Sequence, residues 1–160
     1  MKITFLGTSA AEGYPALFCN CSNCSRAREL GGKNIRHRSS ALVNEDLLID
    51  FRPDTSAQIL QYNSNLTKVK DILLTHSHAD HLSMYDFQYR FPNFQETGSI
   101  QTTNIWANPT SIDAFLDHVK EGFLEVFEGA AGKFAPSKEE IEEELPDFLD
   151  LYLDRKSTRL

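Results

Sequence analysis

The chain has 160 residues, of which 41% are hydrophobic and 11% aromatic, and this composition is typical of a soluble domain with its own core. Its formal net charge of −7 disfavours a general grip on nucleic-acid backbones, because such binding depends on lysines and arginines that neutralise phosphates. No run of about 18 apolar residues is present, so we expect no membrane span. The apolar stretch at the amino terminus is too short for a signal peptide, and we expect a cytoplasmic protein.

Strand and helix signals alternate along the chain, which predicts the mixed α/β class with helices covering the faces of a sheet. In chain order we expect a strand at 2–6, a helix at 22–30, a hairpin of 39–43 and 46–51, a short helix from Asp54 to Tyr62, strands at 69–75 and 100–107, and helices that begin near Thr110 and Ser137. Asp54 is a residue type that caps helices, and Ala57, Ile59 and Leu60 would form the apolar side of that helix.

The segment 75–82, which reads T-H-S-H-A-D-H-L, holds three of the chain's five histidines. His76 and His78 are two residues apart at the end of an expected strand, where such side chains project to the same side and can reach one metal ion. Asp80 and His81 follow and can turn toward a second cation, and this mixture of ligands suits Zn²⁺ or Mn²⁺. Two such ions can share a hydroxide and orient an ester for in-line attack.

All three cysteines fall within six residues, in the pattern C-x-C-x₂-C. An odd number of thiols so close together is a poor disulfide framework and a plausible thiolate metal site in a reducing compartment. Cys19, Cys21 and Cys24 can bind Zn²⁺ tetrahedrally if a fourth ligand comes from elsewhere in the chain. The alternative is three thiols without a metal.

The H-x-H-x-D-H loop after a buried strand resembles the signature of the metallo-β-lactamase-fold hydrolases. The residues Met1–Thr8 are similar to the opening strand and Gly-Thr turn of that family. The segment Leu47–Asp50 is similar to its second landmark, an aspartate that ends a strand beneath the metal loop. The resemblance implies the αββα sandwich of this family, of which the chain would supply the first half.

The same resemblance implies roles for the site residues. His76 and His78 would be ligands of a first metal, and Asp80 and His81 would serve a second. Asp80 would also orient the attacking hydroxide, and Asp50 would lie behind the ligands and orient the loop. Without the family, Asp50 is equally well explained as a turn former at the end of a strand.

The cysteine pattern after the first strand is similar to that of the phosphodiesterases of this fold related to the cyclic-phosphate enzyme of the carbon–phosphorus lyase pathway. This resemblance implies a structural Zn²⁺ at Cys19, Cys21 and Cys24 beside two catalytic ions, Zn²⁺ or Mn²⁺, and a small phosphodiester or related ester as substrate. Another ester hydrolase or an RNA-processing nuclease of the same fold is an alternative, and so is a non-catalytic zinc-binding module. A homodimer is compatible with each of these functions.

Family members carry further ligands downstream: a third histidine, a bridging aspartate and a final histidine. No histidine follows His118 in this sequence. We therefore expect residues 1–153 to be the amino-terminal part of a metallo-β-lactamase-fold domain with an incomplete active site. The abrupt basic ending leads us to expect that residues 154–160 are a non-native or disordered tail.

Overall fold

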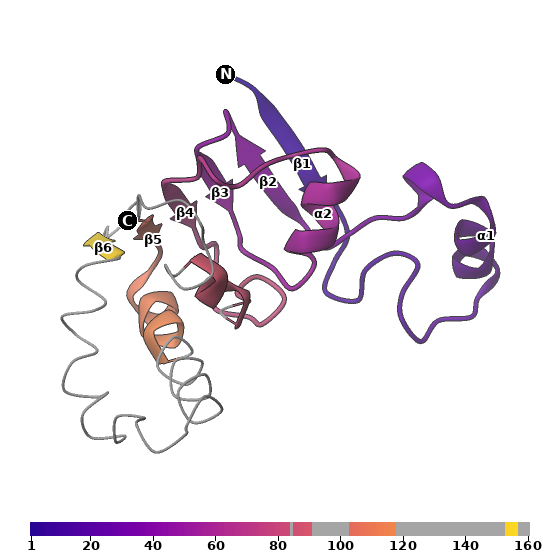
Figure 1. The fold of residues 1–160 in the computed structure, drawn as a ribbon. Coiled ribbons are helices and arrows are strands. Elements are labelled where there is room, and N and C mark those ends of the chain that lie inside the picture. Colours follow the sequence, from indigo (N-terminus) through magenta and orange to yellow (C-terminus); the bar gives the residue numbers. More distant parts are fainter. Residues whose placement is uncertain (84, 91–102, 118–152, 157–160) are drawn as a thin grey trace, which may run out of the picture.

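The structure is a computed structural model that describes residues 1–83, 85–90, 103–117 and 153–156. The strands of these residues form one mixed, six-stranded sheet in the order of the sequence (Figure 1). They are β1 (Ile3–Gly7), β2 (Ser40–Val43), β3 (Leu47–Ile49), β4 (Asp71–Leu73), β5 (Thr103–Trp106) and β6 (Leu153–Lys156). The strands β1, β2 and β3 pair antiparallel, whereas β3 to β6 pair parallel, so the carboxyl ends of β3, β4 and β5 lie at one edge.

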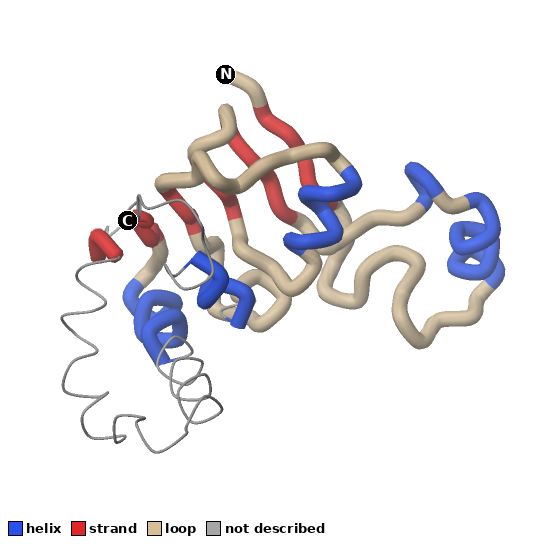
Figure 2. Tube along the Cα trace, viewed as in Figure 1, coloured by secondary structure: helices blue, strands red, loops and turns tan. Residues whose placement is uncertain are grey.

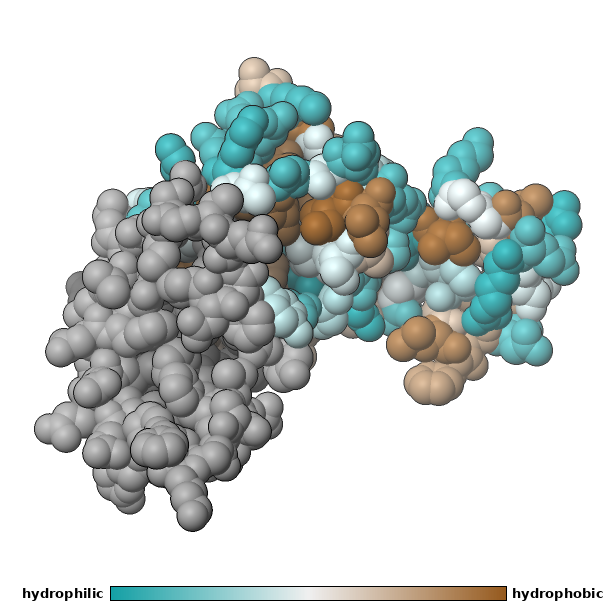
Figure 3. All heavy atoms as spheres, viewed as in Figure 1, coloured by the Kyte–Doolittle hydropathy of each residue, from teal (hydrophilic) through white to brown (hydrophobic). Residues whose placement is uncertain are grey.

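Helical segments lie around the sheet and on an arm that leaves it (Figure 2). They are α1 (Ser22–Leu30), η1 (Gly32–Asn34), α2 (Thr55–Gln61), η2 (Tyr85–Arg90) and residues 109–117. The arm, residues 8–38, extends away from the β1 edge of the sheet and carries α1 at its far end (Figure 1). The hydropathy view shows hydrophobic residues at the surface of both the sheet body and the arm (Figure 3).

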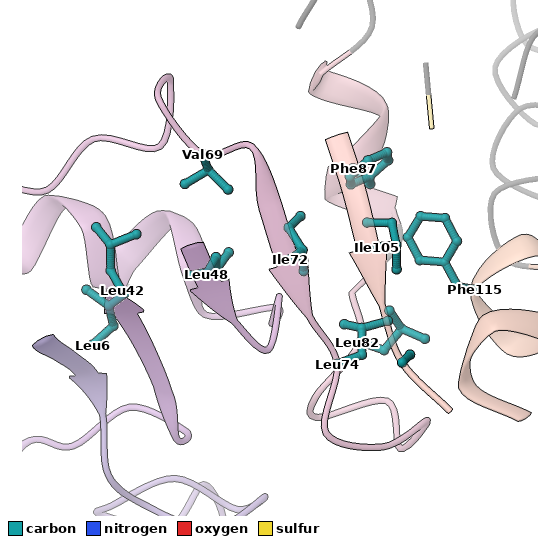
Figure 4. Close-up of a cluster of buried hydrophobic side chains, with 11 residues drawn as sticks. Leu6, Leu42, Leu48, Val69, Ile72, Leu74, Leu82, Phe87, Ile105 and Phe115 are labelled. Carbon is teal, nitrogen blue, oxygen red and sulfur yellow. The ribbon is translucent and has the colours of Figure 1, made fainter. Parts of the chain in front are cut away.

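One row of apolar side chains crosses the sheet and forms its core (Figure 4). Leu42, Leu48, Ile72 and Ile105 are paired in register across four neighbouring strands and are all buried. Phe87 of η2 and Phe115 of residues 109–117 join the same cluster, with their ring centroids 5.4 Å apart. Burying each such side chain contributes about 1.5–3 kcal/mol, so this layer holds the end of β4 in place.

Several elements confirm the sequence-based expectations. The predicted helix at 22–30 coincides with α1, and the predicted hairpin is formed by β2 and β3. The strand expected at 69–75 is shorter, because β4 covers only Asp71–Leu73. The chain then continues along β5 for one more hydrogen bond, from the N–H of Leu74 to the carbonyl of Trp106.

The helix α2 differs from expectation in the face that it buries. Its buried residues are Thr55 and Gln58, whereas Leu60 is 82% exposed. Asp54 stands at the N-cap position, but its carboxylate accepts from the backbone N–H of Arg38 instead of capping the helix. The amide of Gln58 donates to the carbonyl of Arg38, so α2 is attached to the base of the arm by polar contacts.

Two expectations concern the carboxyl-terminal part. The helix expected from Ser137 lies outside the residues that the structure describes. Within the expected tail, residues 154–156 are placed in β6, parallel to β5, and the non-native origin of 154–160 stays a prediction. Across the described ranges, each helix is too short or too polar to pass through a bilayer.

Candidate metal centre

The histidine loop, residues 75–82, leaves the carboxyl end of β4 and is closed by backbone contacts. The carbonyl of His78 accepts from the N–H groups of His81 and Leu82, at 2.8 and 3.1 Å. Leu82 is buried in the core cluster and forms a bridge with Phe51, which follows β3. The loop is therefore tied at both ends to the two central parallel strands.

The three imidazoles of the loop lie together. The ring centroid of His76 is 4.7 Å from that of His78 and 3.9 Å from that of His81. Desolvation, followed by the charges of His81 and His78, lowers the pKa of His76. Because a neutral imidazole has a free lone pair, this shift favours the form of His76 that binds a metal. The expected meeting of His76 and His78 is present, and their ligand role stays a prediction.

Asp50 is buried beneath the loop and contacts Thr75 and His81. Its carboxylate accepts from the N–H and the hydroxyl of Thr75, at 2.8 and 2.9 Å, and lies 2.8 Å from Nδ1 of His81. Asp50 also has a left-handed backbone, with φ of 58°. Carboxylates that hold the other nitrogen of a ligand histidine are common behind metal sites, and this is the role that we expected for Asp50.

Asp80 and His81 are close, but they are engaged with protein atoms. The Oδ2 of Asp80 lies 3.2 Å from Nε2 of His81, while Nδ1 of that ring faces Asp50. Both ring nitrogens of His81 therefore have an oxygen partner within the chain. The two residues expected to hold a second metal are brought together and turned toward each other.

Arg52 is the residue of this site that the sequence reasoning missed. Its side chain is 1% exposed, and its guanidinium contacts Asp50, Asp80 and His81. Burial lowers the pKa of Arg52, and the charges of Asp50 and Asp80 act in the opposite direction. The sequence offered one signal for Arg52: it stands two residues after Asp50, in the segment that follows β3.

The cysteine loop brings its three thiols to one point on the arm. The sulfur atoms of Cys19, Cys21 and Cys24 all lie within 4.8 Å of one another, and among the residues described they are the one such group with metal-ligand spacing. Three thiolates about 2.3 Å from a tetrahedral Zn²⁺ would be separated by roughly 3.8 Å. Arg28 fixes the loop by donating to the carbonyls of Ala16 and Cys19, at 2.8 and 2.7 Å.

The pKa values of two thiols in the cysteine loop shift in opposite directions. A hydrogen bond with the backbone of Ala16 acts to lower the pKa of Cys24, but the side chain of Cys19 and burial outweigh it and raise that pKa. A hydrogen bond with the backbone of Cys24, and then the side chain of Cys19, lowers the pKa of Cys21 to about 7. A thiol with that pKa is half ionised near neutral pH, and the thiolate is the form that binds zinc. The donor set of three converging sulfurs therefore fits the structural Zn²⁺ expected here.

Cys21→Ser is expected to reduce bound zinc by about one equivalent and to lower the melting temperature, because structural zinc contributes folding free energy directly. Zinc content by mass spectrometry and a thermal melt by circular dichroism would measure the two effects. Ser22→Ala, the next residue and also exposed, is the control and should change neither quantity. Unchanged zinc content in the Cys21 variant would reject the site.

Sequence comparisons relate part of this chain to known proteins. No protein-family model matches the chain. Coenzyme PQQ synthesis protein B of Acinetobacter baumannii (strain AYE) is 29% identical over 94 residues, which cover 51% of this chain and 31% of that protein. The same protein from strain ACICU matches equally. The chain thus aligns with less than a third of the length of these curated relatives.

Two solved structures resemble the fold over nearly the whole chain. A diphosphatase from the PhnP family has a TM-score of 0.59 at 20% identity, covering 98% of this chain and 50% of that one. Zn²⁺-bound PqqB from Methylobacterium extorquens has a TM-score of 0.62 at 21% identity, covering 99% and 49%. The expected fold is confirmed: the chain is α/β and has the metallo-β-lactamase fold, spanning about half of these structures.

Proposed function

We propose that this chain, with its metallo-β-lactamase fold, supplies the metal-binding loop of a metal-dependent hydrolase that cleaves a small phosphodiester or related ester. The observation that carries the proposal is the cluster of His76, His78 and His81 beside Asp80 at the carboxyl end of β4. One structure of similar fold is a diphosphatase and another binds Zn²⁺, which supports this chemistry.

The residues of the loop have separable tasks in this proposal. His76 and His78 would hold the ion through their imidazole nitrogens. When bound, Zn²⁺ or Mn²⁺ supplies a Lewis acid and lowers the pKa of water. Thr75 places its hydroxyl 3.0 Å from Nδ1 of His76 while it donates to Asp50, so it links the ligand ring to the buried carboxylate.

Asp80 would act on the attacking water in this proposal. Its side chain is 20% exposed, whereas that of Asp50 is 5% exposed, so Asp80 is the carboxylate of the site that solvent can reach. A carboxylate beside the metal can accept a proton or orient the nucleophile. The acidic balance of the chain favours a small substrate over a nucleic acid.

A second candidate function is a non-catalytic zinc-binding module. The cysteine loop favours it, because its three sulfurs already have the spacing of a metal site. Metal counting separates the two functions. A single zinc that survives removal of the histidines, together with no hydrolysis, would identify the module.

The hydrolase proposal predicts the outcome of replacing His76 and His78 together by alanine. We expect the zinc bound outside the cysteine loop to be lost. Hydrolysis of bis(p-nitrophenyl) phosphate should fall by more than about 10–100-fold, the typical cost of replacing a residue that only supports the metal ligands. Both would be measured in the longest reading frame that contains this chain. The control is His37→Ala, because His37 faces Asp54 at 3.8 Å, outside the loop. Unchanged metal content in the double variant would reject the assignment.

A further inference from the structure

We propose that Arg52 takes the place of a second catalytic metal, so that the histidine loop binds a single divalent ion. The guanidinium is a fixed cation among the residues expected to hold that second ion. This inference rests on the metal-binding function proposed above, and it reduces the expected number of ions at the histidine loop from two to one.

The contacts of Arg52 reach both residues that this chain was expected to supply to a second metal, Asp80 and His81. Its Nη2 lies 3.3 Å from Oδ2 of Asp50 and 2.5 and 3.1 Å from the two ring nitrogens of His81. Its Nη1 donates to the carbonyl of Asp80 at 2.5 Å and lies 3.7 Å from Oδ2 of the same residue. Among the described residues, the hydrogen bonds and ion pairs of Arg52 reach neither His76 nor His78, the two residues expected to hold the first metal.

A second ion would have to share this space with the guanidinium. A divalent ion bonds an imidazole nitrogen at about 2.0–2.1 Å. Because Nη2 is 3.1 Å from Nε2 of His81, an ion on that nitrogen would lie no farther than about 5 Å from Arg52. Repulsion between a divalent ion and a cation at this separation is strong where water cannot screen it, and the Arg52 side chain is 1% exposed.

Arg52 cannot easily leave to make room. Its backbone N–H donates to the hydroxyl of Thr55 at 2.9 Å, and the preceding residue Phe51 is bridged to Leu82. A guanidinium has donors only and keeps its charge, so it needs acceptors wherever it is buried. Asp50 and Asp80 provide acceptors for Nη2 and Nη1, while Nε has no hydrogen-bond partner among the described residues. Moving Arg52 would deprive both carboxylates of their cation.

Arg52 could stabilise the fold or replace a metal ion, and variants that keep or remove its charge distinguish these two roles. Arg52→Lys keeps a cation in the site, whereas Arg52→Met removes it and retains much of the side-chain volume. If Arg52 only stabilises the fold, both variants lower the melting temperature and neither changes the number of ions bound. If it replaces a metal, the number of ions depends on the charge.

The test is the number of Zn²⁺ or Co²⁺ ions bound per chain in the longest reading frame that contains this chain. Every variant, the parent included, carries Cys21→Ser, so that only the ions at the histidine loop are counted. We expect one equivalent at the loop in the parent chain and in Arg52→Lys, and two in Arg52→Met. Two equivalents in the parent chain would overturn the inference and leave the hydrolase proposal standing. No equivalent at the loop would overturn both.

A second measurement needs no variant at position 52 to fold. The electron paramagnetic resonance spectrum of the Co²⁺-loaded parent chain should show isolated high-spin ions, because the loop and the cysteine site would each hold one. Spin coupling between two ions would overturn the inference, since bridged ions lie about 3.5–4 Å apart. If Arg52→Met is folded by circular dichroism and gains no ion, the inference is also wrong.

Discussion

Asp50→Asn is expected to lower the free energy of unfolding by about 3–5 kcal/mol, because it leaves the buried guanidinium of Arg52 without its neighbouring buried carboxylate. Asparagine tolerates the left-handed backbone at this position, so the substitution removes the charge and spares the turn. The corresponding fall in melting temperature is roughly 6–20 °C for a chain of this size. Urea unfolding followed by circular dichroism would measure the change.

Two further variants show whether the loss at Asp50 comes from the buried charge. Glu45 pairs with Lys68 at 2.9 Å on an exposed turn, and Glu45→Gln should leave the unfolding curve unchanged. Adding Arg52→Met to Asp50→Asn should recover part of the lost stability, because the unpaired cation is then gone. A double variant that is no more stable than Asp50→Asn alone would contradict this account.

The sequence carried the features of the site that depend on local spacing. The three histidines and Asp80 lie within six residues, so their meeting required only a turn at the end of β4. The three cysteines needed only one loop for the same reason. Asp50 could be assigned to the site only through the resemblance to the family. Its partner Thr75 is 25 residues away and is brought close by the parallel pairing of β3 with β4.

Arg52 and α2 escaped the sequence reasoning for a common physical reason. The burial of a charged or polar side chain is decided by partners that are distant in sequence, and Arg52 finds Asp80 at a separation of 28 residues. Gln58 is buried through its bond to Arg38, 20 residues before it. Hydrophobic periodicity detects only apolar faces, so it predicted that Ala57, Ile59 and Leu60 form the buried side of α2. Of these, Ile59 is half-buried, whereas Ala57 and Leu60 are exposed, because the face that α2 buries is held by polar bonds.

Gly7→Ala is expected to separate the arm from the sheet and to destabilise the chain by about 3 kcal/mol or more, at or beyond the upper end of typical overpacking costs. An added Cβ would lie 1.9 Å from the carbonyl oxygen of Arg38 and 2.7 Å from that of His37, and both atoms belong to the backbone. The His37 carbonyl also accepts from the N–H groups of Thr8 and Ser9, at 3.0 and 2.9 Å, so any shift would break the bonds at the base of the arm.

Gly31→Ala is the matched control for this last prediction, because it changes the same residue type on the same arm. Gly31 has φ of 59° and ψ of −156°, a conformation that is essentially confined to glycine, and no atom lies within 4 Å of an added Cβ. Only the backbone conformation is therefore penalised, by about 1–3 kcal/mol. Thermal melts should place the Gly7 variant below the Gly31 variant, because only the Gly7 variant adds a clash with other backbone atoms. Zinc binding at Cys19, Cys21 and Cys24 should persist in both, since these residues lie within six positions at the start of α1. Equal melting temperatures would mean that the arm is not held at Gly7, and that its position relative to the sheet is set by the contacts of Arg38 and Gln58 instead.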